Sequence, residues 1–89
     1  MKKAVMIIVS GKVQGVGFRY SALKKANELG LKGFIRNKTD GSVYIEIEGE
    51  PEILDHFTEW CRMGPSWAQV NDLYLENIPL SNFVSFEIK

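Results

Sequence analysis

The sequence has little of the chemistry on which disulfides and soft-metal sites depend. Its 89 residues include one cysteine, Cys61, and one histidine, His56. A single cysteine excludes an internal disulfide, and the two residues together are too few to ligate a structural zinc ion. We therefore expect no soft-metal site and a chain that resides in the reducing cytoplasm. We also expect no cofactor.

Two further absences limit the class of partner. The formal net charge is zero, from 11 basic and 11 acidic residues, whereas nucleic-acid-binding domains usually carry a basic excess. No segment has the roughly 20 consecutive apolar residues of a membrane-spanning helix. We expect neither a nucleic-acid nor a membrane partner. The apolar run 4–9 ends without a small-residue cleavage site, and we interpret it as a first strand rather than a signal peptide.

The spacing of apolar residues and glycines divides the chain into seven elements. Strands are indicated where apolar residues alternate, and helices where they recur three and four positions apart. Gly30 closes the first helix, and Gly64-Pro65 closes the second. The predicted strands are 4–10, 31–38, 43–48, 70–76 and 83–88, and the predicted helices are 18–29 and 51–63.

This order of elements is typical of an α+β, ferredoxin-like βαββαβ sandwich. The two helices carry similar apolar stripes, so both need to cover the same face of one sheet. In strand 43–48, Val43, Ile45 and Ile47 alternate with polar residues, which predicts one buried face and one wet face. We expect a single domain over residues 1–89: an antiparallel sheet, two helices on one face and a short extra C-terminal edge strand. We expect it to be a monomer.

A glycine-rich segment, Gly11-Lys12-Val13-Gln14-Gly15-Val16-Gly17-Phe18-Arg19, joins the first strand to the first helix. Met6 and Val13 break the pattern of a Walker loop, and Tyr20 breaks that of a dinucleotide-binding loop. Glycine backbones and the first N–H groups of a helix can instead hold one phosphate-sized anion, to which Arg19 adds a bidentate fork. In the alternative interpretation, the glycines only form a tight connection and Arg19 is a solvated surface residue.

A second candidate residue, Asn37, lies at the end of strand 31–38. A carboxamide both donates and accepts hydrogen bonds, so Asn37 can hold a water molecule while donating to a phosphate. Alternatively, it only steers the hairpin turn that Asp40-Gly41 predicts. Arg36 lies on the opposite face of the strand and cannot serve the same site. We interpret His56 as a surface residue and Cys61 as part of the core.

These motifs together resemble those of the acylphosphatase family, in order and spacing over nearly the whole chain. Lys12, Phe34 and Ser66 stand where arginine, tryptophan and proline are common, and none of them is a functional side chain. The segments that carry the resemblance are Gly11-x-Val13-Gln14-Gly15-Val16-Gly17-Phe18-Arg19, Gly30-Leu31-x-Gly33-Phe34-Ile35-Arg36-Asn37-x-x-Asp40-Gly41-x-Val43, Gly64-Pro65-Ser66-Trp67-Ala68-x-Val70 and Phe83-Val84-Ser85-Phe86-Glu87-Ile88.

The resemblance implies a metal-independent hydrolase that cleaves the carboxyl–phosphate anhydride of an acyl phosphate to carboxylate and inorganic phosphate. It implies two catalytic residues: Arg19, which binds the phosphate, and Asn37, which orients the attacking water. Inorganic phosphate or sulfate is expected to compete with substrate. The expected phosphate-binding residues are Gln14, Gly15, Val16, Gly17, Phe18 and Arg19.

Two other classes of protein share this order of elements. An RNA-recognition module presents a Gly-Phe-Ala/Gly-Phe-Val pattern on its third strand. Lys32-Gly33-Phe34 begins in that way, but Ile35-Arg36 breaks the pattern and the predicted third strand offers only Tyr44. A non-catalytic ligand-sensing or partner-binding domain is the second alternative, because a fold alone does not determine function.

Overall fold

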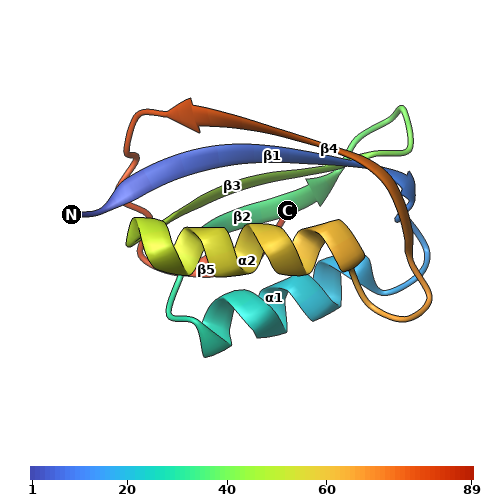
Figure 1. Ribbon diagram of the computed structural model, residues 1–89, viewed down its shortest axis with the longest axis horizontal. Coiled ribbons are helices and arrows are strands. Elements are labelled where there is room, and N and C mark those ends of the chain that lie inside the picture. The colour runs from blue at the N-terminus through green and yellow to red at the C-terminus, as the bar shows by residue number, and fades with distance from the viewer.

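The chain folds into one five-stranded sheet with two helices packed against one face (Figure 1). The computed structural model describes residues 1–89. Its elements are β1 (Lys3–Lys12), α1 (Phe18–Glu28), β2 (Lys32–Asn37), β3 (Val43–Gly49), α2 (Pro51–Met63), β4 (Gln69–Ile78) and β5 (Phe86–Ile88). The strand order is β4-β1-β3-β2-β5, antiparallel among the first four, with β5 parallel to β2. The expected ferredoxin-like fold with a C-terminal edge strand is confirmed.

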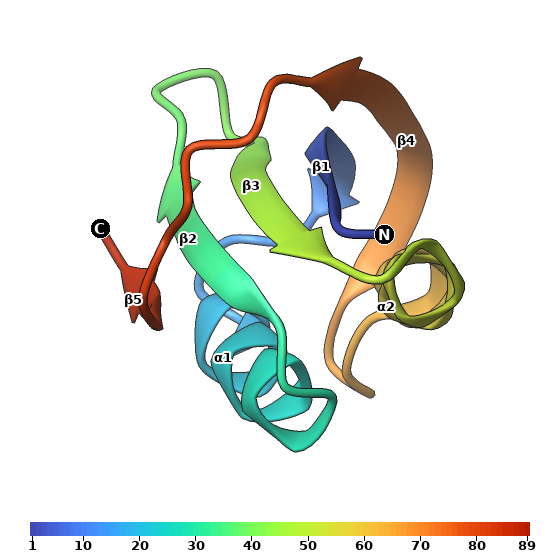
Figure 2. The same ribbon diagram turned by 90° about the vertical axis from the view of Figure 1, so that its left-hand side faces the viewer.

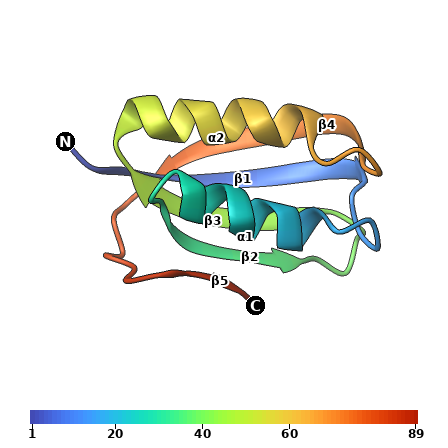
Figure 3. The ribbon, with the colours of Figure 1, turned by 90° about the horizontal axis from the view of Figure 1, so that it is seen from below.

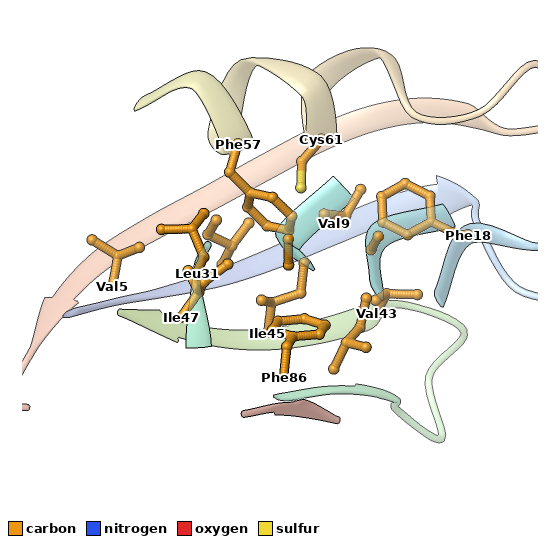
Figure 4. Close-up of a cluster of buried hydrophobic side chains, with 14 of the residues drawn as sticks. Val5, Val9, Phe18, Leu31, Val43, Ile45, Ile47, Phe57, Cys61 and Phe86 are labelled. Atoms are coloured by element: carbon orange, nitrogen blue, oxygen red, sulfur yellow. The ribbon is translucent and has the colours of Figure 1, made fainter. Parts of the chain in front are cut away.

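The hydrophobic core lies between the sheet and the two helices. Figures 2 and 3 show both helices on the same side of the sheet, running along the strands. Because side chains alternate along a strand, every second residue of β1 and β3 faces this layer. Phe57 and Cys61 of α2 point into it from above, and Phe86 of β5 reaches it from the sheet edge (Figure 4). Neither helix is long and apolar enough to span a lipid bilayer.

The helix ends follow the glycine and proline signals of the sequence. At the end of α1, the N–H of Gly30 donates to the carbonyl of Asn27 at 3.2 Å, and the N–H of Leu31 donates to that of Ala26 at 2.9 Å. These are the two bonds of a Schellman motif, which uses a left-handed residue at the position of Gly30. Pro51 occupies the first position of α2, where a missing N–H costs nothing.

The final strand is shorter than predicted, because β5 begins only at Phe86. The backbone N–H groups of Ser81, Asn82 and Phe83 donate to the carboxylate of Glu48 instead of to a neighbouring strand. Glu48 itself is only 1% exposed, so the wet face predicted for strand 43–48 is wrong at this position. Three charge-assisted hydrogen bonds offset the cost of burying this carboxylate.

The first strand is longer than predicted, and this shortens the glycine-rich loop. The register shifts between Ser10 and Gly11, after which Gly11 pairs with Val70 and Lys12 pairs with Gln69 of β4. The connection between β1 and α1 is therefore residues 13–17, and Gly11 lies outside it.

Candidate active site

The loop 13–17 turns the chain from β1 into α1 and contains two left-handed glycines. The φ angles of Gly15 and Gly17 are 74° and 79°, a region that glycine enters without steric cost. No atom lies within 4 Å of the place that a Cβ would take at either residue, so backbone conformation and not crowding favours glycine there. The side chain of Val16 packs against the core and anchors the loop.

The start of α1 offers backbone donors that no side chain uses. Its N-cap is Gly17, which has no side chain to bond them, and the first turn contains no acidic residue. The first helical bond runs from the N–H of Ser21 to the carbonyl of Gly17 at 3.0 Å. The N–H groups before Ser21 have no acceptor within the helix, and together with the helix dipole they favour an anion at this end.

Arg19 lies in this first turn, half-buried, beside a hollow of about 170 Å³. The ion pairs of the protein are Met1–Glu50, Lys25–Glu28 and Arg62–Glu59, so no carboxylate neutralises Arg19. Its planar fork of donors is consequently free for an external anion, for which guanidinium is well shaped. The hollow is lined by Val13, Gly15, Gly17, Phe18, Arg19, Tyr20 and Ile88.

Asn37 is the last residue of β2, and its side-chain oxygen is buried without a partner. Oδ1 of Asn37 is the only buried side-chain nitrogen or oxygen in the protein that makes no hydrogen bond. An unsatisfied buried acceptor costs about 1–3 kcal/mol, and such groups are rare in folded proteins. The atom therefore has an acceptor capacity that no group of the protein uses, and it is closed to solvent in this structure.

The side chain of Gln14 is committed to the protein itself. Its Nε2 donates to the carbonyl oxygens of Lys38 and Ser42, both at 2.8 Å. These bonds join the loop to the β2–β3 hairpin, beside Asn37, and leave only the backbone N–H of Gln14 for an anion. Gln14 was predicted among the phosphate-binding residues. This link was not predicted, since its partners lie 24 and 28 residues further along the chain.

The structure brings most of the predicted loop residues together. Gly15, Gly17, Phe18 and Arg19 all line the hollow, whereas Gln14, Val16 and Asn37 do not. Asn37 is connected to the loop through the bonds of Gln14 to the hairpin. Tyr20 and Ile88 also line the hollow and were not predicted as site residues. Ile88 comes from β5 and is placed there by its pairing with Ile35 of β2, which no local pattern indicates.

The other reactive side chains lie apart from this loop. His56 is exposed on α2, as predicted, and Cys61 is fully buried in the core, where burial raises the pKa of its thiol. No three histidine, cysteine, aspartate or glutamate side chains are grouped so that they can hold a metal ion.

Two aromatic rings on the face of the sheet that the helices leave open are covered by cations of the chain. The guanidinium of Arg36 lies 4.8 Å above the ring of Tyr44, and the ammonium of Lys89 lies 4.5 Å above the ring of Phe34. Burial, followed by the hydrogen bond to Glu46, raises the pKa of Tyr44 to about 12. Bases need free ring faces for stacking, and the rings of Tyr44 and Phe34 each have one face occupied by a cation.

The fold defines a class of small α+β domains in which two helices cover one face of a five-stranded sheet and a short glycine-containing loop joins β1 to α1. The sequence matches the profile of the Acylphosphatase family over residues 5–88, and the chain belongs to the acylphosphatase family. It is 45% identical over 85 residues to an acylphosphatase of Archaeoglobus fulgidus, with 96% of each chain covered. It is therefore a hydrolase that acts on acyl phosphates.

Solved structures show the same relationship. An acylphosphatase from Coxiella burnetii superimposes with a TM-score of 0.95 at 38% identity, over 99% of this chain and 93% of that one. Full-length HypF, solved in a phosphate- and nucleotide-bound form, superimposes with a TM-score of 0.90 at 27% identity. The match covers 100% of this chain and only 12% of HypF. A similar domain thus also occurs as a small part of a larger protein.

Proposed function

We propose that this chain hydrolyses the carboxyl–phosphate anhydride of acyl phosphates, with the phosphate held by the loop 13–17 and Arg19 and the attacking water held by Asn37. The observation that carries the proposal is the buried, unpartnered Oδ1 of Asn37. No group of the protein uses the acceptor capacity of this atom, and we assign that capacity to the attacking water. Asn37 directly precedes Lys38, whose carbonyl is one of the two that Gln14 ties to the loop.

The phosphate end of the site is electrostatic. A phosphate group placed at the start of α1 accepts hydrogen bonds from the free N–H groups of the loop and first turn and from the guanidinium of Arg19. Because no carboxylate pairs with Arg19, its full charge acts on the phosphate oxygens. The transition state of phosphoryl transfer spreads charge over those oxygens, so the same donors stabilise it. Inorganic phosphate or sulfate offers the same oxygens and is expected to compete.

At the other end of the site, Asn37 contributes by orienting the attacking water. Oδ1 of Asn37 accepts one hydrogen of the water and directs its oxygen lone pair toward phosphorus, opposite the acyl oxygen. As the new P–O bond forms, the bond from phosphorus to the acyl oxygen breaks, and its electron pair leaves with the carboxylate. The proton that the water loses passes to a phosphate oxygen of the substrate. A carboxylate is a weak base, with a pKa of about 4, so it leaves without a protein acid.

The test measures turnover of benzoyl phosphate together with release of inorganic phosphate. We expect one phosphate for each anhydride cleaved, the same rate with and without EDTA, and much slower turnover of p-nitrophenyl phosphate, a monoester that has no carboxylate leaving group. Arg62→Ala and Asn77→Ala, two exposed residues outside the loop, serve as matched controls for Arg19→Ala and Asn37→Ala. Absence of turnover in the folded wild-type protein contradicts the proposal.

A further inference from the structure

We infer that Gln14 is a positioning residue that fixes the water-binding Asn37 relative to the phosphate-binding loop. The inference rests on the proposed function and adds a residue that contacts neither the water nor the reacting atoms with its side chain. Both protons of its amide are used within the protein, on the carbonyls of Lys38 and Ser42 at 2.8 Å.

The two acceptors identify what Gln14 holds. Lys38 follows Asn37 directly in the chain, and Ser42 lies across the hairpin from Lys38, whose N–H donates to the Ser42 carbonyl at 2.8 Å. One side chain therefore grips both arms of the hairpin at its base. At its other end, the backbone of Gln14 continues directly into Gly15, a residue of the hollow beside Arg19. The amide of Gln14 is therefore a side-chain tie between the phosphate-binding loop and the hairpin that carries Asn37.

The hairpin does not need Gln14 in order to form. Its arms are joined by the Lys38–Ser42 backbone bond, and the N–H of Gly41 donates to the carbonyl of Lys38 at 3.3 Å. The carboxylate of Asp40 accepts the N–H of Ser42 at 2.9 Å and its hydroxyl at 2.6 Å. Loss of the Gln14 amide leaves all of these bonds in place, so the hairpin remains closed but is no longer tied to the loop.

The chemistry of the contact requires glutamine. Each carbonyl needs a donor, and the amide provides two N–H groups on one nitrogen. Methionine keeps the length of the side chain and donates nothing, and glutamate places a negative charge against two carbonyl oxygens. Asparagine is one methylene shorter. We expect Gln14→Met and Gln14→Glu both to weaken the tie, with the larger effect from glutamate.

The experiment is a double-mutant cycle with Gln14→Met and Asn37→Ala, measured with benzoyl phosphate, and Gln69→Met as the control on an exposed glutamine of β4. We expect Gln14→Met to lower kcat about 10²-fold, the cost of misplacing a reacting group by about 1 Å. The inhibition constant of inorganic phosphate should stay unchanged. In the Asn37→Ala background, the same substitution should lower kcat no further, because the group that it positions is gone.

A second readout does not depend on turnover. In the wild-type protein, phosphate binding should shift the NMR signals of the Asn37 side-chain amide, and this shift should shrink in Gln14→Met while the loop amides still respond. The inference is overturned if Gln14→Met keeps the wild-type kcat, or if it costs as much with Asn37→Ala as without it. It is also overturned if phosphate shifts the Asn37 amide equally in both proteins. A wild type that binds phosphate with the expected NMR response but hydrolyses no acyl phosphate contradicts the proposed function instead.

Discussion

The carboxylate of Glu48 on β3 accepts the backbone N–H of Phe83 at 3.0 Å, across 35 residues of sequence. The same carboxylate accepts hydrogen bonds from the N–H groups of Ser81 and Asn82, so it anchors the segment that leads into β5 to the sheet. Ile88 of that strand lines the hollow beside Arg19. A buried carboxylate on one side of the sheet therefore supports one wall of the site.

We expect Glu48→Gln to destabilise the protein. The amide turns an N–H group toward backbone donors and removes the charge that strengthened three hydrogen bonds, which costs about 3 kcal/mol. Glu46→Gln is the matched control on the same strand, because its amide oxygen can still accept the hydroxyl of Tyr44. Urea unfolding monitored by circular dichroism gives both values. Equal stabilities of the two variants contradict a supporting role for Glu48.

A contrast between two glycines separates crowding from backbone strain. A Cβ on Gly33 of β2 overlaps the carbonyl oxygen of Glu46 on the adjacent strand and approaches the Cα of Ile47 to 2.8 Å. Backbone atoms in a paired strand cannot move away without breaking the ladder, so we expect Gly33→Ala to prevent folding at 37 °C. Gly41 also has a positive φ, of 95°, but no atom lies within 4 Å of its Cβ position. Gly41→Ala should cost only about 1–2 kcal/mol. Thermal unfolding of both variants tests this difference.

The thiol of Cys61 should resist modification as long as the protein is folded. The residue is fully buried, and burial raises the pKa of its thiol, so little reactive thiolate is present at pH 8. A thiol reagent should therefore label Cys61 in denaturant and not in buffer. Labelling in buffer at the rate of a free thiol contradicts this burial.

The same pKa difference predicts a loss of stability in alkali. Above about pH 9 the unfolded chain releases the Cys61 proton and the folded chain keeps it, so unfolding is favoured by about 1.4 kcal/mol for each further pH unit. Tyr44 and Tyr74, whose pKa values are also raised, act in the same direction. Comparison with Cys61→Ala isolates the contribution of the thiol: the variant should have a shallower fall in stability between pH 9 and 11. Parallel curves contradict the prediction.

The elements of the fold follow from local signals, and the errors arise where partners are distant in sequence. Alternation and helical spacing predicted the seven elements, and Gly30 marked the end of α1. Residues 83–85 have strand-like composition, but the backbone N–H of Phe83 donates to Glu48, which lies 35 residues earlier in the chain. The burial of Glu48 escaped prediction for the same reason, since an acidic residue in an alternating strand indicates a wet face.

The candidate site likewise contains some residues that local motifs predicted and some contacts that depend on the assembled fold. Arg19 was predicted as an anion ligand from its local glycine-rich segment, and the role of Asn37 was implied by the family resemblance of the motifs around it. The link from Gln14 to Lys38 and Ser42 depends on how the loop meets the hairpin, and only the assembled sheet shows it. The place of Ile88 at the hollow likewise depends on β5 pairing with β2.

The last prediction separates the two proposed catalytic side chains by affinity and rate. Arg19 acts on phosphate oxygens in both the ground state and the transition state, so Arg19→Ala should weaken phosphate binding and also slow turnover. Asn37 acts on the water, so Asn37→Ala should lower kcat and leave phosphate affinity nearly intact, because an interaction specific to the transition state appears in kcat. Loss of one well-placed group costs about 10²–10³ in rate, which we expect as a minimum for each variant.

Steady-state kinetics and phosphate titration of both variants measure these quantities, with circular dichroism to establish that they are folded. Asn37 carries no charge and its oxygen has no bond to lose within the protein, so its removal should not disturb the loop. A folded Asn37→Ala variant with the wild-type kcat would show that Asn37 only shapes the hairpin. A folded Arg19→Ala variant that binds phosphate as tightly as the parent would place the anion elsewhere, since Arg19 is the only charged side chain that lines the hollow.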